Sequence, residues 1–384
     1  MTIKEASLFC KDGDWIESKD QSLSGIRLIQ TGNIGVGVYL DKFSRAKYIS
    51  EETFNKLECT EVFPGDIIIS RLPTPVGRAC IVPDGLGRTI AAVDCTILRI
   101  NEKKFLKEYV LLYTETGQYK SQIEKFLAGS TRVRISRKNL ESISIPQKNL
   151  ETQKNIVSII YKIKNIVELR KQQLSKLDQL VKSRFIEMFG DPVENPYKWN
   201  MIYLNMLGEL NRGISKHRPR NAPELLNGKY PLIQTGDIAS SDLYITKYSS
   251  TYSELGLKQS RMWPSGTLCI TIAANIAKTS ILKFDACFPD SVVGFISGKE
   301  YMQVFIYFWF SFFQKILEEQ APESAQKNIN LKILNELKVI SPPSSLQKDF
   351  FKFVQQVEKT KSSVKQSLEK LETLKKTLMQ EYFG

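Results

Sequence analysis

Four segments contain the residues whose chemistry can be read directly. Two are basic clusters, 131–138 and 212–220, and two are expected to be equivalent loops between matching strands, 71–78 and 274–278. Arg and Lys bind phosphate oxygens, and Arg also makes paired hydrogen bonds to the edge of guanine. These groups favour nucleic-acid binding, with a solvated basic surface as the alternative for any one residue. The predicted contacts are Arg71, Thr74, Arg78, Arg132, Arg134, Arg137, Lys138, Lys216, Arg218, Arg220, Asn275 and Lys278.

The net charge agrees with an anionic partner. The 384 residues include 54 Lys and Arg against 41 Asp and Glu, which gives a formal charge of +13. A protein of this charge attracts nucleic acid, but ribosome association or an anionic membrane surface would require the same balance. Charge alone therefore leaves these three partners open.

The sequence contains no combination of residues that predicts catalysis. It has a single histidine, His217, so a His-rich metal site or a His-based triad in both halves is excluded. The glycines of 32–37 lack the spacing of a phosphate-binding loop. Residues 195–197, Asn-Pro-Tyr, lack one proline of the motif of amino-methylating enzymes. We predict a non-catalytic protein that holds no metal or cofactor.

The cysteines and the apolar segments predict a cytoplasmic protein. The six cysteines form no Cys-x-x-Cys pair and most lie in apolar runs, as reduced core thiols do. Residues 1–14 lack the apolar core of a signal peptide. The apolar run 304–313 is shorter than the roughly 20 residues that span a bilayer, so we expect a core helix there and no membrane partner.

The basic groups lie between segments that occur twice. Leu-Ile-Gln-Thr-Gly appears at 28–32 and again at 232–236, and the second halves of two long amphipathic segments match without a gap. In order, the pairs are 28–34 with 232–238, 63–68 with 263–268, 77–81 with 277–281, 93–96 with 289–292, and 174–190 with 368–384. Their constant order indicates a duplication, in which the framework repeats and the basic loops differ.

Each half is predicted to be a mixed domain followed by a helical arm. The first half has strand patterns at 26–34, 67–70 and 91–100 and a helical pattern at 102–127. The arms run from Asn149 to Gly190 and from a Ser-x-x-Gln capping box at 344–347 to the last residue. Apolar residues at coiled-coil spacing predict that the arms pack on each other, which we favour over packing on their own domains. These seam residues are Ile160, Ile163, Val167, Leu174, Leu177, Val181, Val357, Val364, Leu371 and Leu378.

The whole chain resembles the specificity subunit of type I restriction-modification systems. The resemblance is carried by the two Leu-Ile-Gln-Thr-Gly copies, the turn at 64–68, the segment 140–146 leading to 153–156, and 189–199 with Gly190, Pro192 and Trp199. The chain departs from the family at Ser344 and Ser345, where an acidic approach to the helix is usual. The resemblance implies an α+β fold: two target-recognition domains, 1–147 and 191–343, and two arms, 148–190 and 344–384, packed as an antiparallel coiled coil with a pseudo-two-fold repeat.

The resemblance also implies a function. The protein would be the non-catalytic DNA-recognition subunit, reading a bipartite asymmetric site in double-stranded DNA with one domain per half-site and the arms as a ruler. Its partners would be two methyltransferase subunits using S-adenosylmethionine and two restriction subunits using ATP and Mg, with no cofactor in this chain. Two alternatives are a methyltransferase or nuclease fused to such domains and a basic helical scaffold or DNA-binding protein outside such a complex.

Overall fold

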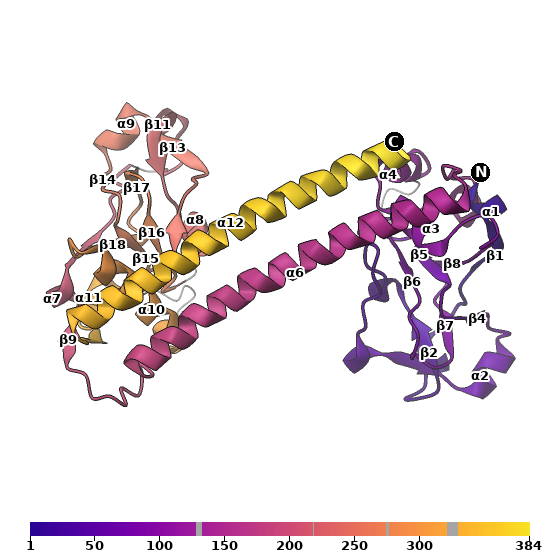
Figure 1. Cartoon of the computed structure of the whole chain (residues 1–384), viewed down its shortest axis with the longest axis horizontal. Coiled ribbons are helices and arrows are strands. Elements are labelled where there is room, and N and C mark those ends of the chain that lie inside the picture. The colour runs from indigo at the N-terminus through magenta and orange to yellow at the C-terminus, as the bar shows by residue number, and fades with distance from the viewer. Residues whose placement is uncertain (128–132, 218, 274–275, 321–328) are drawn as a thin grey trace. The chain divides into compact units, whose positions relative to one another are not determined.

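The chain folds into two compact units. The computed structural model describes residues 1–127, 133–217, 219–273, 276–320 and 329–384. Unit 1 comprises Met1–Lys171 and Gln366–Gly384, and unit 2 comprises Gln172–Lys365. Both long helices, α6 (Leu150–Phe189) and α12 (Ser344–Phe383), begin in one unit and end in the other (Figure 1).

Unit 1 contains two four-stranded sheets, and the first is buried on both faces, since Ile67 and Ile68 of one strand belong to different core clusters. The first has the order β1-β8-β5-β6 and is antiparallel, and the second has the order β3-β2-β7-β4 with β2 parallel to β7. The strands are β1 (Ser7–Asp12), β2 (Ile26–Ile29), β3 (Lys47–Ile49), β4 (Glu61–Val62), β5 (Ile67–Ser70), β6 (Ala79–Ile81), β7 (Thr89–Ala91) and β8 (Cys95–Ile100).

The helical region of unit 1 is more broken than its pattern predicted. The expected helix 102–127 is wrong as a single element, because Thr116 accepts a hydrogen bond from Tyr119 N at 3.1 Å and caps a new helix. The helices are α1 (Ile3–Ala6), α2 (Glu51–Lys56), α3 (Lys107–Thr114), α4 (Gly117–Lys125) and α5 (Arg137–Glu141), with 3-10 turns η1 (Ser18–Asp20), η2 (Thr31–Asn33) and η3 (Phe43–Arg45).

Unit 2 repeats this plan. Its sheets have the orders β10-β18-β15-β16-β12 and β13-β11-β17-β14, and β19 pairs with β9. The strands are β9 (Met201–Tyr203), β10 (Glu209–Arg212), β11 (Leu226–Leu232), β12 (Tyr244–Ile245), β13 (Ser250–Tyr252), β14 (Met262–Trp263), β15 (Leu268–Thr271), β16 (Thr279–Leu282), β17 (Ala286–Cys287), β18 (Val292–Ile296) and β19 (Lys338–Ile340). The helices are α7 (Leu204–Leu207), η4 (Pro223–Leu225), α8 (Thr235–Ser240), α9 (Glu254–Lys258), α10 (Glu300–Gln320) and α11 (Leu331–Asn335).

The hydrogen-bond register confirms the duplication and corrects two of its pairings. Gly77 and Ala277 match as predicted, since their N–H groups bond to the last residues of β5 and β15 at 2.8 and 2.9 Å. Gly65, however, matches Gly266 and not Ser265, because both glycines have positive φ and both donate to the strand opposite. The pairing of 93–96 with 289–292 is also wrong by one residue. Cys95, the first residue of β8, matches Val292, the first residue of β18, and not Ser291. An ungapped alignment cannot place a one-residue loop difference.

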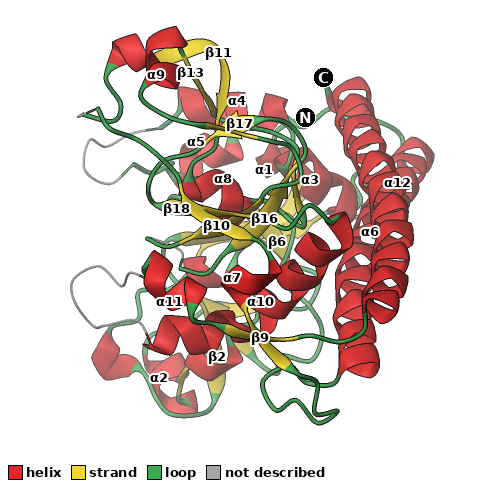
Figure 2. Ribbon diagram, turned by 90° about the vertical axis from the view of Figure 1, so that its left-hand side faces the viewer, coloured by secondary structure: helices red, strands yellow, loops and turns green. Residues whose placement is uncertain are grey.

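The long helices lie antiparallel within each unit. In unit 1 the Lys171 ammonium lies 4.0 Å from the Glu372 carboxylate. In unit 2 the corresponding Lys361–Asp178 distance is 2.8 Å, and the Phe185 and Phe350 ring centroids are 5.4 Å apart. Residues later in α6 therefore contact residues earlier in α12. The two helices lie side by side (Figure 2).

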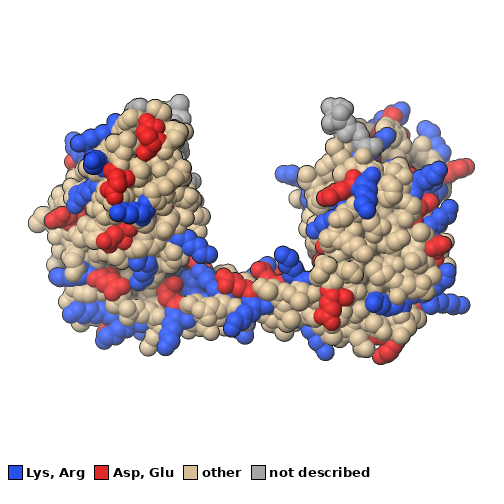
Figure 3. All heavy atoms as spheres, turned by 90° about the horizontal axis from the view of Figure 1, so that it is seen from above, with Lys and Arg blue, Asp and Glu red and all other residues tan. Residues whose placement is uncertain are grey.

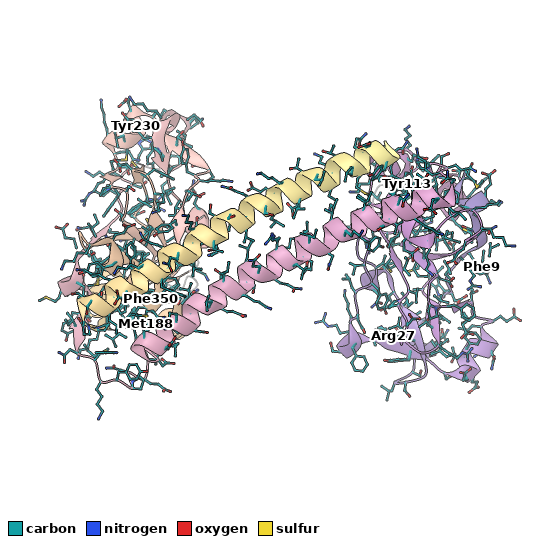
Figure 4. All side chains as sticks on the ribbon, in the orientation of Figure 1. Phe9, Arg27, Tyr113, Met188, Tyr230 and Phe350 are labelled. Carbon is teal, nitrogen blue, oxygen red and sulfur yellow. The ribbon has the colours of Figure 1, made fainter. Side chains whose placement is uncertain are left out.

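The ends of the helices also belong to the domain cores. Ile160 is part of the core of unit 1 and Val181 part of the core of unit 2, and both are buried. Phe350 and Met188, labelled in Figure 4, pack in the same core of unit 2. Our preference against packing on the domains was therefore wrong at the helix ends. Among the other seam residues, Ile163, Val167, Val357 and Val364 are buried, while Leu174, Leu177, Leu371 and Leu378 are half-buried.

The helix starts are set by different groups. Asn149 caps α6 as predicted, accepting a hydrogen bond from Thr152 N at 2.8 Å. The capping box predicted for α12 is wrong, because the Gln347 side chain donates to Pro342 O at 2.8 Å instead of reaching back to Ser344. The apolar run 304–313 lies inside α10 and is largely buried. Over the residues that the structure describes, no helix is long and apolar enough to cross a membrane.

Candidate nucleic-acid interface

In unit 1 the loops that differ from those of the second copy begin at one edge of the first sheet. At this edge Asp12 pairs with Thr96 and Ser70 pairs with Cys95, so the end of β1, the β5–β6 hairpin tip and the start of β8 lie together. The segment around residue 135 joins them, because Ile135 N donates to Arg71 O at 3.3 Å. We call residues 13–25, 71–78 and 133–138 the loop edge of unit 1.

Arg71 and Arg78 hold the loop edge together from inside. Arg71 is only 9 % exposed; its guanidinium donates to Val93 O at 2.6 Å and lies 3.4 Å from the Asp12 carboxylate. Arg78 is half-buried, which lowers its pKa. Its four side-chain hydrogen bonds, 2.7–2.9 Å long, go to the carbonyl oxygens of Thr31, Ile34, Leu72 and Pro75. Both guanidinium groups have internal partners, so the geometry favours a structural role over the DNA contact expected for them.

Other predicted contacts in unit 1 face solvent. Thr74 is exposed at the hairpin tip, and Arg134 and Lys138 are exposed in the segment 133–138. Arg137 forms an ion pair with Glu141 at 3.2 Å, which leaves part of its guanidinium available. Arg132 lies outside the described residues. The loop edge of unit 1 therefore presents a smaller basic surface than the sequence suggested.

Unit 2 has an equivalent loop edge that starts from the same backbone feature. Gly13 and Gly213 donate to Cys95 O and Val292 O, each at 2.8 Å. A Cβ on Gly13 would lie 2.2 Å from Ala91 O, and one on Gly213 would lie 2.3 Å from Pro289 O. Only glycine fits at these two positions, where β1 and β10 end and their loops begin.

Several of the DNA contacts predicted for unit 2 also have hydrogen-bond or ion-pair partners within the chain. Lys216 is exposed, and Arg220 forms an ion pair with Asp290 at 2.5 Å. Lys278 donates through its ammonium to Gln314 Oε1 at 3.2 Å. His217 lies 3.8 Å from the Glu224 carboxylate, consistent with the basic surface expected for it. Arg218 and Asn275 lie outside the described residues.

The structure adds a loop that sequence reasoning missed. Because Gly13 and Gly213 are equivalent, residues 14–25 occupy in unit 1 the place that the basic loop 214–222 occupies in unit 2. Trp15 is 69 % exposed in this loop. The loop carries three acidic residues and one lysine, so a search for basic clusters could not find it. The signal that could have found it is the repeated glycine that directly follows β1 and β10.

The visible surface has no single basic patch. On the face seen in Figure 3, Lys and Arg side chains are interspersed with Asp and Glu over both units. Within the described part of the chain, no group of three or more His, Cys, Asp or Glu side chains could hold a metal ion. Two copies of one domain, with differing loops on a repeated framework and shared long helices, define a duplicated recognition protein.

Comparison with known proteins identifies the family. The sequence matches the type I restriction modification DNA specificity domain twice, at residues 5–179 and 196–373. The chain belongs to this family. It is therefore a DNA specificity subunit of the type I restriction-modification class and not a catalytic subunit.

Relatives and solved structures agree with this assignment. The chain is 22% identical over 339 residues to a putative type I restriction enzyme MjaX specificity subunit of Methanocaldococcus jannaschii, covering 82% of this chain and 76% of the relative. Its fold is similar to the type I restriction-modification S subunit from M. genitalium, with a TM-score of 0.62, 15% identity and coverage of 100% and 95%. A chain from a study of complex assembly and conformational transition of the type I R-M system gives a TM-score of 0.62, 16% identity and coverage of 99% and 96%.

Proposed function

We propose that this chain reads a bipartite, asymmetric site in double-stranded DNA, with one unit for each half-site. The observation that supports this most directly is the contrast within the duplication. The backbone hydrogen bonds at Gly13 and Gly213 repeat, while the loops that follow carry different side chains. A repeated framework with differing loops suits two readers of different sequences. Exposed residues such as Arg134, Lys138 and Lys216 are the best candidates for these contacts.

The long helices suit a spacer between the two readers. Each helix has 40 residues, and at about 1.5 Å per residue an α-helix of this length extends about 60 Å. Both helices pass from one unit into the other without interruption. We propose that they set the length of the unread sequence between the half-sites, as readers on one DNA face lie about one helical turn apart or a multiple of it.

The same proposal assigns partners and cofactors to other chains. Two methyltransferase subunits that use S-adenosylmethionine would dock on the helices and the adjacent surfaces, and two restriction subunits that use ATP and Mg would join through them. The fold similarity to a chain from a study of complex assembly of the type I R-M system supports an assembled complex. Flipping of the target adenine by the methyltransferase would favour DNA that is distorted at the half-sites, so part of the specificity would come from DNA deformability.

A cytoplasmic site of action completes the proposal. All six cysteines are free, and five of them are buried. Burial raises the pKa of Cys80 to about 12, which keeps its thiol protonated and unreactive. Such thiols suit a reducing compartment, where DNA modification would take place.

Methylome sequencing tests the proposed function. Cells would express this chain with its neighbouring methyltransferase, and control cells would lack this chain alone. A split motif with methyladenine in both halves, lost in the control, is the expected result. Unchanged methylation with a folded, expressed methyltransferase would instead indicate a scaffold or a DNA-binding protein outside a modification complex.

A further inference from the structure

An exposed run of three residues occurs in both units although the fold does not require it. Residues 42–44 are Lys-Phe-Ser and residues 247–249 are Lys-Tyr-Ser. We call each run the Lys-aromatic-Ser triple. The loops around them differ in length and composition, so the triple is not part of a longer conserved segment.

Both triples lie in the same connection of the fold, between β2 and β3 in unit 1 and between β11 and β13 in unit 2. Upstream, Gln30 and Gln234 each donate their backbone N–H to the side chain three residues later, at 2.9 and 2.8 Å. Downstream, Ser50 and Ser253 each cap the helix that follows the triple, α2 and α9. The two triples therefore lie in the equivalent connection of each unit, although two residues separate 42–44 from β3 and 247–249 directly precedes β13.

The side chains of the triples are turned to solvent. All six residues are exposed; Phe43 is 77 % exposed and Tyr248 is 48 % exposed. Tyr248 packs edge-on against Phe284, with ring centroids 5.4 Å apart. In the described part of the chain, the ammonium groups of Lys42 and Lys247 make no hydrogen bond or ion pair. Such an aromatic ring contributes little to folding, so folding does not explain why the triple repeats.

Repetition itself limits what the triples can touch. Residues that read two different half-sites must differ between the units, whereas a repeated surface suits something that both half-sites share. The sugar–phosphate backbone is common to both. Lys and Ser are phosphate ligands, and an exposed aromatic ring packs against sugars and base edges.

The charge around the first triple also suits DNA. Lys42, Arg45 and Lys47 are exposed within six residues of one another. The single acid beside them, Asp41, is neutralised by an ion pair with Arg27 at 2.5 Å. Residues 41–47 therefore carry a net positive charge.

We propose that residues 42–44 and 247–249 are a matched pair of sequence-independent DNA contacts, one at each half-site. Lys and Ser bind phosphate oxygens, and Phe43 or Tyr248 packs against the adjacent sugar and base edge. This inference rests on the proposed function, because it needs two half-sites read by two units. It differs from that proposal in assigning affinity, and not specificity, to these residues.

The test measures DNA binding by the chain assembled with its methyltransferase. The probes are two fluorescent duplexes, one with the motif found by methylome sequencing and one with both half-sites scrambled. We expect Phe43→Ala and Tyr248→Ala to weaken binding to both duplexes about tenfold, with an unchanged ratio between them. Lys42→Ala and Lys247→Ala should each reduce the slope of log affinity against log salt by about 1.

Two variants with matched exposure serve as controls. Met206 is 74 % exposed and Tyr203 is 46 % exposed, and neither belongs to a triple; alanine there should leave both affinities unchanged. Wild-type affinity in the Phe43 and Tyr248 variants, or loss for the motif duplex only, would overturn the inference. Loss of methyltransferase binding without DNA would overturn it too, in favour of a protein-docking role. If the wild-type complex itself does not discriminate the two duplexes, both this inference and the proposed function fail.

Discussion

In both units the end of a long helix packs into the domain core, but the side chains around it differ. Phe189 ends α6 in unit 2 and Phe383 ends α12 in unit 1, and both are almost completely buried. Phe189 packs against Phe305 and Phe350, with ring centroids 5.1 and 5.4 Å away. Phe383 packs instead against two tyrosines. The duplicated phenylalanine is thus retained while its surroundings have changed.

The tyrosines of unit 1 bring polar groups to the junction. Tyr109 and Tyr113 lie with ring centroids 4.9 and 5.9 Å from that of Phe383, and Tyr113 is labelled in Figure 4. The Tyr109 hydroxyl donates to Pro146 O at 3.0 Å, and the Tyr113 hydroxyl accepts from Gln122 at 2.5 Å. Unit 2 relies on apolar aromatic packing, whereas unit 1 adds hydrogen bonds. The comparison teaches that the ring at the helix end is the fixed requirement.

The hairpin tips show the same contrast. Gly77 N and Ala277 N make equivalent backbone hydrogen bonds, and both residues have positive φ. In unit 1 the Arg78 guanidinium then binds four carbonyl oxygens, whereas in unit 2 the Lys278 ammonium binds one side chain. Backbone register defines the shared fold, and the side chains stabilise it differently in each copy.

Exchange of one whole domain has the largest expected effect. Replacing residues 1–147 by the corresponding part of another family member should change the methylated sequence completely in one half-site and leave the other half unchanged. Methylome sequencing measures both halves at once. A change in both halves would contradict independent reading by the two units.

The second-largest effect is expected from loss of the repeated phenylalanine, which should lower the stability of one unit. Phe189→Ala and Phe383→Ala each remove a fully buried ring, which costs about 3–5 kcal/mol. Hydrogen exchange measured by mass spectrometry should show faster exchange mainly in unit 2 for the first variant and in unit 1 for the second. Leu374→Ala, at a position that is 46 % exposed on α12, is the control and should change little. Equal destabilisation of both units by either variant would show that the units do not fold independently.

Arg78 and Lys278 should differ in their effect on stability. Arg78→Ala leaves several partly buried carbonyl oxygens without their donor, so we expect a loss of about 3 kcal/mol from unit 1. Lys278→Ala removes one hydrogen bond and should cost about 1 kcal/mol. Thermal unfolding and hydrogen exchange measure both. A stable Arg78→Ala protein with weakened DNA binding would restore the DNA contact expected from the sequence.

Arginine in the basic segment 131–138 should affect DNA binding alone. Arg134→Ala, and equally Arg132→Ala, should weaken binding by about 1–2 kcal/mol and relax discrimination in one half-site. Assembly with the methyltransferase should be unaffected. Fluorescence anisotropy with duplexes altered in one half-site at a time measures this, with Lys216→Ala as the counterpart for the second half-site. Wild-type affinity in the arginine variants would remove them from the interface.

Much of the fold could be predicted because its signals are local. The heptad spacing of α6 and α12 and the turn at Gly65 depend on residues close in sequence. The break at Thr116 was missed, because the apolar pattern continues across it. The capping of α12 was mistaken, since Gln347 found a backbone acceptor at Pro342 that only the packed chain brings within reach.

The sequence by itself determined the duplication, the two long helices and the class of protein, because repeated segments and helical periodicity are properties of residue order. Only the tertiary structure decided which basic residues face solvent. Arg78 and Arg134 look alike in the sequence, yet Arg78 reaches the carbonyls of Thr31 and Ile34 and Arg134 is exposed. A long side chain can bind carbonyl oxygens that are distant in sequence only where the folded sheets bring those carbonyls within reach; otherwise it stays in solvent.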